Sequence, residues 1–289
     1  MFDTLIQAEE LRDLLDSRAD VVVVDCRHDL QHPDAGLTLY REGHIPGAVF
    51  AHMDNDLSGP HREVGDGRHP WPSAEKFLAT LRQWNVLTTT QVVAYDSGNG
   101  ALAARVWFLL RMLGHEAVAV LDGGLARWSE LGLPLSASLE EAEPSPPDDT
   151  LVRGWHRNGF NATRLINADA VAKRLERGRM LIDSRGADRF AGQNETIDPI
   201  AGHIPGAVNR PFMANLGPDG RFKSPSALRA EFDALLDGRD PSEVMVMCGS
   251  GVTATHNLLA MQLAGLDGAA LFTGSWSGWI ETPTNPVTQ

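Results

Sequence analysis

One cysteine of this chain lies in a loop whose composition suits nucleophilic chemistry. Cys248 follows an apolar run at residues 244–247 and is followed by Gly249-Ser250-Gly251 and a helical pattern at residues 253–263. Glycines let the backbone curl so that successive amide N–H groups point inward and form a nest for an anion, and the next helix adds its N-terminal positive charge. Such a field favours the thiolate, the nucleophilic form of cysteine. We therefore expect Cys248 to act as a covalent nucleophile.

The only other cysteine, Cys26, comes at the end of the apolar run at residues 21–24 and has no glycine-rich loop after it. We expect it to be a buried structural residue, as free cysteines usually are. Two cysteines far apart in the sequence exclude a disulfide framework and an all-cysteine zinc site. The sequence predicts no metal site and no cofactor.

Four blocks of the sequence occur twice in the same order. An apolar run ends in Asp-x-Arg at residues 25–27 and again at residues 183–185, and Gly-His-Ile-Pro-Gly-Ala-Val occurs at residues 43–49 and 202–208. Residues 92–96 and 122–128 then correspond to residues 244–248 and 273–279, so the offsets lie between 151 and 159 residues. Such a period is far too long for a solenoid and predicts two copies of one domain.

The two copies define the expected domains. We predict an N-terminal domain at residues 1–135, a linker rich in proline and glutamate at residues 136–154, and a C-terminal domain at residues 155–289. Apolar runs alternate with helical patterns, so each domain is expected to be an α/β fold: a mainly parallel sheet with helices on both faces. The expected strands are residues 21–24, 92–95, 117–121, 181–182, 244–247 and 269–272, and the expected helices are residues 8–15, 74–81, 101–113, 168–175, 227–236 and 253–263.

Composition and charge limit the partners. The chain of 289 residues has a formal net charge of −13, which disfavours a nucleic-acid surface because phosphates need clustered basic side chains. Its apolar runs are strand-sized, and the first residues have neither a basic segment nor an apolar signal core. We therefore expect a cytoplasmic protein with no membrane and no nucleic-acid partner.

The repeat and its motifs together resemble the tandem-domain rhodanese-type sulfurtransferases, from about residue 5 to residue 279. The resemblance implies that only the C-terminal copy is catalytic, because Asp96 stands at the position of Cys248 in the first copy. It also implies that Cys248 takes a sulfane sulfur from a small-molecule donor, becomes a persulfide, and passes the sulfur to cyanide or to a thiol acceptor such as a thioredoxin-like protein. The loop residues expected to bind the donor are Gly249, Gly251, Val252 and Thr253.

The resemblance leaves the donor open between thiosulfate and 3-mercaptopyruvate. Thiosulfate-preferring members place an arginine and a lysine directly after the cysteine, whereas the uncharged Gly249-Ser250 is similar to the loop of 3-mercaptopyruvate sulfurtransferases. In that branch the serine assists proton movement with an aspartate and a histidine. The closest matches are Ser250, Asp54 and His69, with Asp56 as a competing register for the aspartate.

Arg189 matches the substrate-binding arginine of the family, and a guanidinium suits carboxylate or thiosulfonate oxygens. The mercaptopyruvate branch has a second arginine nine residues later, but this chain has Asp198 there. An acid at this position is expected to weaken a carboxylate clamp. The loop thus favours 3-mercaptopyruvate slightly, while Asp198 argues against it.

Two alternatives use the same kind of loop. A cysteine phosphatase needs an arginine six residues after the cysteine, and this chain has Ala254 there, which argues strongly against that class. The second alternative is a rhodanese-like redox or sulfur sensor, or a scaffold, that does not turn over. The intact Cys248 loop argues against this reading for the C-terminal copy.

Overall fold

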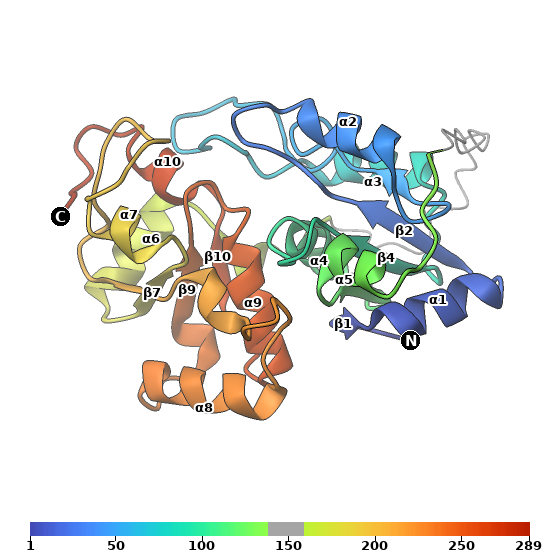
Figure 1. Ribbon diagram of the computed structural model, residues 1–289. Helices are drawn as coiled ribbons and strands as arrows, with labels where there is room; N and C mark the ends of the chain where they lie inside the picture. Colours follow the sequence, from blue (N-terminus) through green and yellow to red (C-terminus); the bar gives the residue numbers. More distant parts are fainter. Residues whose placement is uncertain (138–158) are drawn as a thin grey trace. The chain divides into compact units, whose positions relative to one another are not determined.

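The computed structural model describes residues 1–137 and 159–289, which form two compact units (Figure 1). Of the described residues, the first unit comprises Met1–Gly59, 72–137, 159–161 and Asp219–Arg221, and the second comprises Pro60–Trp71, Ala162–Pro218 and Phe222–Gln289. Most of the predicted linker, residues 136–154, lies outside the described residues. The 60–71 segment packs with the second unit, although the sequence places it within the N-terminal domain.

The first unit contains a parallel sheet of five strands in the order β1-β5-β4-β2-β3. Its helices cover the sheet in the usual α/β manner. In chain order the elements are β1 (Leu5–Ile6), α1 (Ala8–Asp16), β2 (Val21–Asp25), α2 (Ala35–Glu42), β3 (Val49–Phe50), α3 (Ala74–Gln83), β4 (Gln91–Tyr95), α4 (Ala103–Met112), β5 (Val118–Leu121) and α5 (Gly124–Glu130).

The second unit repeats this topology, with strand order β6-β10-β9-β7-β8 and parallel pairing throughout. Its elements are β6 (Leu165–Ile166), α6 (Ala168–Glu176), β7 (Met180–Asp183), α7 (Ala187–Phe190), β8 (Ala207–Asn209), α8 (Pro225–Leu236), β9 (Val244–Met247), α9 (Ala254–Leu263), β10 (Ala270–Phe272) and α10 (Ser275–Trp279). Short 3₁₀ turns occur at Ala162–Arg164, Phe212–Asn215 and Pro241–Glu243. Two parallel α/β sheets of identical strand order confirm the predicted fold class.

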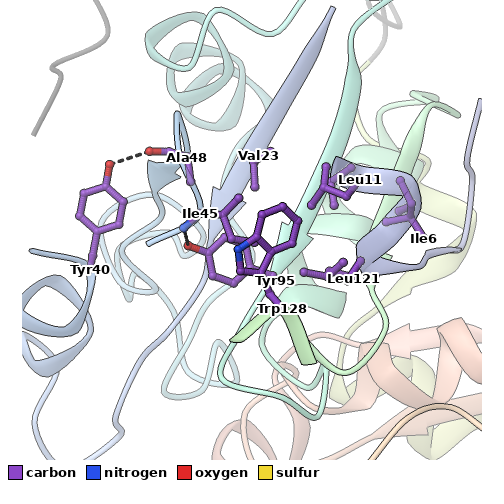
Figure 2. Close-up of a cluster of buried hydrophobic side chains, with 12 residues drawn as sticks. Ile6, Leu11, Val23, Tyr40, Ile45, Ala48, Tyr95, Leu121 and Trp128 are labelled. Atoms are coloured by element: carbon purple, nitrogen blue, oxygen red, sulfur yellow. Dashed lines mark hydrogen bonds between the residues drawn. The ribbon is translucent and has the colours of Figure 1, made fainter. Parts of the chain in front are cut away.

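The strands alternate their side chains between two cores, as the period of a β-strand requires. In the first unit Val23, Tyr95 and Leu121 point to the face covered by Leu11 of α1 and Trp128 of α5, as Figure 2 shows. The opposite face is covered by α4, which packs against β4 and β5. Because both faces are buried, these strands are continuous apolar runs.

The corresponding core of the second unit joins β9 and β10 to α6 and α10. Met245 and Phe272 pack with Val171 of α6 and with Trp276 and Trp279 of α10. On the other face α9 packs against β9, β10 and α8. The end of β9 is thereby fixed from both sides, and Cys248 is the next residue.

Side-chain caps begin several of the predicted helices. Ser73 accepts a hydrogen bond from the backbone N–H of Lys76 at the start of α3, and Asn167 does the same for Ala170 in α6. Helix α8 begins at Pro225, two residues earlier than the pattern of apolar residues predicts, because Ser224 caps it and proline suits its first position.

The repeated Asp-x-Arg blocks form buried ion pairs at matching strand ends. Arg27 binds Asp25 and the carbonyl oxygen of Gly43, and Arg185 binds Asp183 and the carbonyl oxygen of Gly202. Since the contacts recur in both units, they hold the loop after the first long strand of each sheet. No helix within residues 1–137 and 159–289 is long and apolar enough to cross a membrane.

Candidate active site

The thiol of Cys248 lies at the carboxyl end of β9, the central strand of the second sheet. The cysteine is 1% exposed, and its Sγ accepts the backbone N–H of Gly251 at 3.2 Å. Gly251 has φ +77°, a left-handed conformation that glycine adopts without steric cost. The turn leads directly into α9, so the thiol lies at the helix N-terminus, where positive partial charge favours an anion.

Gly249 serves the loop in a different way. Its backbone does not have a positive φ, but a Cβ built on it would lie 3.4 Å from Arg68 Nη2 and 3.6 Å from Arg189 Nη2. A side chain here would touch both groups only at ordinary van der Waals distance, so two guanidinium groups lie beside the backbone that follows Cys248.

Helix α10 holds the Cys248 loop in place through hydrogen bonds to its backbone. The N–H of Trp276 donates to the carbonyl oxygen of Cys248 at 3.0 Å, and the N–H of Ser277 donates to that of Gly249 at 2.8 Å. The Oγ of Ser275 accepts the N–H of Cys248 at 3.1 Å. These contacts explain why the block containing residues 273–279 recurs in the sequence: it fixes the loop that follows the central strand.

The 60–71 segment lies across α10 because glycines on both sides permit close approach. A Cβ on Gly274 or Gly278 would overlap the carbonyl oxygen of Gly65. The segment is also held by polar contacts: the N–H of Gly65 donates to Glu281 at 2.6 Å, and the N–H of Arg68 donates to Ser277 Oγ at 3.0 Å. This docking brings Arg68 and His69 to the Cys248 loop.

His69 meets the middle residue of the loop. Its Nδ1 lies 2.8 Å from the Oγ of Ser250, and both residues are buried, at 3% and 6% exposure. An imidazole hydrogen-bonded to a hydroxyl can pass a proton between them. The structure thus brings together three of the four residues for which the sequence predicts a catalytic role.

Arg189 lies on α7 and is bound by two carboxylates. Its Nε and Nη2 donate to Glu195 at 3.0 and 2.9 Å, and Nη2 also donates to Asp198 at 3.0 Å. Burial by itself would raise the pKa of Glu195, but the backbone N–H of Asp198 and the Arg189 guanidinium hold that pKa below its usual range. Glu195 is therefore ionised at neutral pH and offsets part of the positive charge.

Asp198 does more than replace an arginine. Its Oδ1 accepts from Arg68 Nη1 at 2.6 Å, while its Oδ2 accepts from Arg189, and its side chain is 2% exposed. From the sequence alone, this acid is expected only to remove a positive charge from the site. In the structure it bridges two arginines, one of which, Arg68, sequence reasoning misses because its position depends on a segment 130 residues away.

The other predicted donor-binding residues, Val252 and Thr253, directly precede α9. The carbonyl oxygen of Val252 accepts the N–H and the Oγ of Thr255, and Thr253 has helical backbone angles. Their backbone thus forms the last turn of the loop around Cys248.

In the first unit the side chain of Asp96 occupies the centre of the corresponding loop. The carboxylate of Asp96 accepts backbone N–H groups from Gly98, Gly100, Leu102 and Ala103 at 2.9 to 3.4 Å. A loop of this type therefore binds an anion, which supports the expectation for its counterpart. Cys26 is buried, and burial first, with Asp25 and Asp96 nearby, raises the pKa of its thiol well above the ordinary value, in agreement with a structural role.

Asp54 and Asp56 both lie in the first unit, after β3. Asp54 is exposed, whereas Asp56 accepts the backbone N–H of His52 at 2.7 Å, and burial raises its pKa. This hydrogen bond ties Asp56 to its own loop, and the assignment of Asp54 to the proton relay stays a prediction.

The histidine spacing in the sequence includes one pair four residues apart, His28 and His32. Residues 28–32 are not helical, so the pair does not form a metal-binding face. Throughout the two described ranges, no group of three or more histidine, cysteine or acidic side chains is arranged to hold a metal ion.

Comparison of the sequence with models of known protein families identifies the family of this chain. The model of the rhodanese-like domain matches residues 7–131 and again residues 167–282. The chain belongs to the rhodanese family. Its tandem arrangement agrees with the two sheets of equal topology.

Similar proteins carry sulfurtransferase names. A Pseudomonas aeruginosa protein named "Probable 3-mercaptopyruvate sulfurtransferase" is 45% identical over 285 residues, covering 98% of this chain and 97% of that protein. A Mycobacterium tuberculosis protein named "Putative thiosulfate sulfurtransferase SseB" is 39% identical over the same length, covering 98% and 96%. The crystal structure of SseA from Escherichia coli, described as a 3-mercaptopyruvate sulfotransferase with the "Rhodanese" fold, has a TM-score of 0.77 at 30% identity and covers 96% of this chain and all of that one.

Proposed function

We propose that this rhodanese-family protein is a sulfurtransferase that moves a sulfane sulfur from 3-mercaptopyruvate or thiosulfate to cyanide or a thiol, through a persulfide on Cys248. The observation that carries the proposal is the hydrogen bond from the Gly251 N–H to the Cys248 sulfur, at the start of α9. The same field that favours a thiolate favours the anionic persulfide that replaces it. In this proposal the N-terminal domain, residues 1–135, is non-catalytic because Asp96 occupies the corresponding loop.

The chemistry balances in two steps. The Cys248 thiolate attacks the thiol sulfur of 3-mercaptopyruvate or the outer sulfur of thiosulfate. The S–C bond of 3-mercaptopyruvate, or the S–S bond of thiosulfate, breaks, and its electron pair leaves on the pyruvate enolate or on sulfite. The acceptor then attacks the outer sulfur of the persulfide, and the thiolate leaves. Only the enolate needs a proton to become product, and the hydrogen-bonded pair of His69 and Ser250 is suited to deliver it.

Charge around the loop favours 3-mercaptopyruvate slightly. Arg68 and Arg189 are balanced by Glu195 and Asp198, so the group as a whole is near neutral. A buried site without excess positive charge recovers less of the desolvation cost of the thiosulfate dianion than of a carboxylate monoanion. The names of the two relatives, one of each kind, agree with both donors being candidates.

The acceptor in this proposal is cyanide in the test tube and a thiol, such as that of a thioredoxin-like protein, in the cytoplasm. The test is thiocyanate formation from each donor by the wild type and by Cys248→Ser, with Cys26→Ser as the matched control. Activity lost in Cys248→Ser and kept in Cys26→Ser supports the proposal. If the wild type forms no thiocyanate while its thiol is still oxidised readily by peroxide, the sensor alternative replaces it.

A further inference from the structure

Two guanidinium groups lie on the same side of the Cys248 loop. A Cβ built on Gly249 would lie 3.4 Å from Arg68 Nη2, and 3.6 and 3.7 Å from the Nη2 and Nη1 of Arg189. One of these arginines comes from α7 and the other from the 60–71 segment, so two distant parts of the chain meet at one glycine. Since the next residue on the N-terminal side is Cys248, both groups border the reacting sulfur's loop.

Asp198 holds the two arginines in this arrangement. Each of its oxygens accepts from one guanidinium, at 2.6 Å from Arg68 and 3.0 Å from Arg189, and the carboxylate is almost completely buried. Arg68 uses Nη1 for this contact, so its Nη2 is the atom nearest Gly249. Arg189 uses Nε and Nη2 for its carboxylates, and both its Nη2 and its Nη1 lie within 3.7 Å of the Cβ position of the same glycine.

Both arginines remain within reach of a ligand. The side chain of Arg68 is 29% exposed and that of Arg189 is 20% exposed, whereas the acids that bind them are 2% exposed. A solute that enters the site therefore meets the guanidinium groups before the carboxylates. Guanidinium N–H groups match the paired oxygens of a carboxylate or a thiosulfonate group.

We propose that Arg68 is a donor-binding residue, and that Asp198 is the positioning residue that aims it and Arg189 at the donor's oxyanion end. The inference rests on the proposed sulfurtransferase function. It replaces the view that an acid nine residues after Arg189 weakens the clamp: the second guanidinium is present, but it is contributed by the 60–71 segment.

A simpler role for Arg68 would be to fasten the 60–71 segment to the second unit through its ion pair. That role predicts lower stability and a displaced His69, and thus a lower kcat, with little change in donor KM. Donor binding predicts the opposite pattern, a raised KM with kcat nearly retained. The two roles therefore separate in steady-state kinetics.

The experiment measures kcat and KM for both donors in Arg68→Met, Arg68→Lys and the matched control Arg62→Met, an exposed arginine of the same segment. We expect Arg68→Met to raise donor KM roughly 10- to 100-fold, the size expected for a lost charged hydrogen bond, with Arg68→Lys between it and the wild type and Arg62→Met unchanged. Unchanged KM for both donors in a folded Arg68→Met protein, or a loss confined to kcat, would overturn the inference.

A charge swap tests whether Arg68 and Asp198 act as a pair. Arg68→Asp and Asp198→Arg are each expected to lower kcat/KM, because the first places two acids together and the second puts a third guanidinium beside Arg68 and Arg189. In the double variant the guanidinium and the carboxylate exchange positions. Its kcat/KM is therefore expected to be at least about tenfold higher than the value that additive losses of the two single variants would give. Additive losses in the double variant would contradict the assignment. Persulfide formation on Cys248 in all variants at saturating donor keeps this result separate from a failure of the proposed function.

Discussion

The Nδ1 of His69 lies 2.8 Å from the Oγ of Ser250, in a part of the site where both side chains are buried. His69 reaches this position only because glycines in the 60–71 segment and α10 allow their backbones to touch. The relationship links a residue from the first quarter of the chain to the loop of Cys248, so the proposed proton transfer would depend on the docking of that segment.

Ser250→Ala is expected to lower kcat far more for 3-mercaptopyruvate than for thiosulfate. The reaction with 3-mercaptopyruvate leaves an enolate that needs a proton, whereas sulfite leaves thiosulfate without one. We expect the variant to lose about 100-fold in kcat for 3-mercaptopyruvate, within the range for general acid catalysis, and less than about threefold for thiosulfate. Parallel assays with cyanide as acceptor check this. Equal losses with both donors would mean that Ser250 shapes the loop instead of moving protons.

Asp54 and Asp56 are distinguished by their local contacts. Asp56 accepts the N–H of His52, so Asp56→Ala, which removes the acceptor, is expected to lower the melting temperature with little effect on kcat. Asp54 is exposed, so Asp54→Asn is expected to leave stability unchanged and to lower kcat for 3-mercaptopyruvate. Thermal melts and kinetics on the two variants make the comparison. Normal kcat in Asp54→Asn would remove this residue from the proton relay.

Asp198→Asn removes one negative charge and one of the two acceptor oxygens that bind Arg68 and Arg189, while keeping the size of the side chain. Removing one negative charge next to Arg68 and Arg189 favours a dianion over a monoanion, because the attraction scales with the donor's charge. The ratio of kcat/KM for thiosulfate to that for 3-mercaptopyruvate is expected to rise about tenfold, equivalent to about 1.4 kcal/mol. The same ratio in Glu231→Gln, which alters an ion-paired acid elsewhere in the second unit, is the control and stays constant. A falling ratio in Asp198→Asn would contradict the electrostatic account.

Asp96 is expected to be important for stability. Asp96→Ala leaves four backbone N–H groups without their carboxylate, and two of them, on Gly100 and Ala103, belong to buried residues. Leaving buried donors unsatisfied costs about 1–3 kcal/mol each, so we expect a loss of about 3 kcal/mol in the free energy of unfolding by urea. Ser97→Ala, at the exposed neighbouring position, is the control with a loss below about 0.5 kcal/mol. A loss of that small size in Asp96→Ala would show that the loop does not depend on a bound anion.

The long strands and helices are predictable from the sequence because each is a regular apolar pattern. The two-residue strands β1, β3 and β6 are not, since they are too short to show a period and exist only by pairing with a longer strand. Helix α7 is missed for the same reason: its four residues pack no buried side chain. The repeat compensates for part of this, since one copy indicates what its counterpart does.

The site is predictable where it is local. Cys248, its glycines and Ser250 are neighbours in the chain, and their chemistry follows from residue type. The partnership of Arg68 with Asp198 is not predictable, because it joins positions 130 residues apart through the docking of a loop that has no periodic pattern. From the sequence alone, Asp198 is interpreted as a residue that weakens the binding of a carboxylate. With Arg68 and Arg189 in place, it is instead the residue that positions both guanidinium groups.

The most direct test of the central claim is intact-mass analysis of the protein after treatment with 3-mercaptopyruvate or thiosulfate. If Cys248 carries the persulfide, the wild type gains one sulfur atom and cyanide removes it as thiocyanate. Cys26→Ser then behaves identically, while Cys248→Ser gains nothing. A sulfur adduct retained in Cys248→Ser, or a wild-type adduct that cyanide cannot remove, would contradict a transferable persulfide on Cys248.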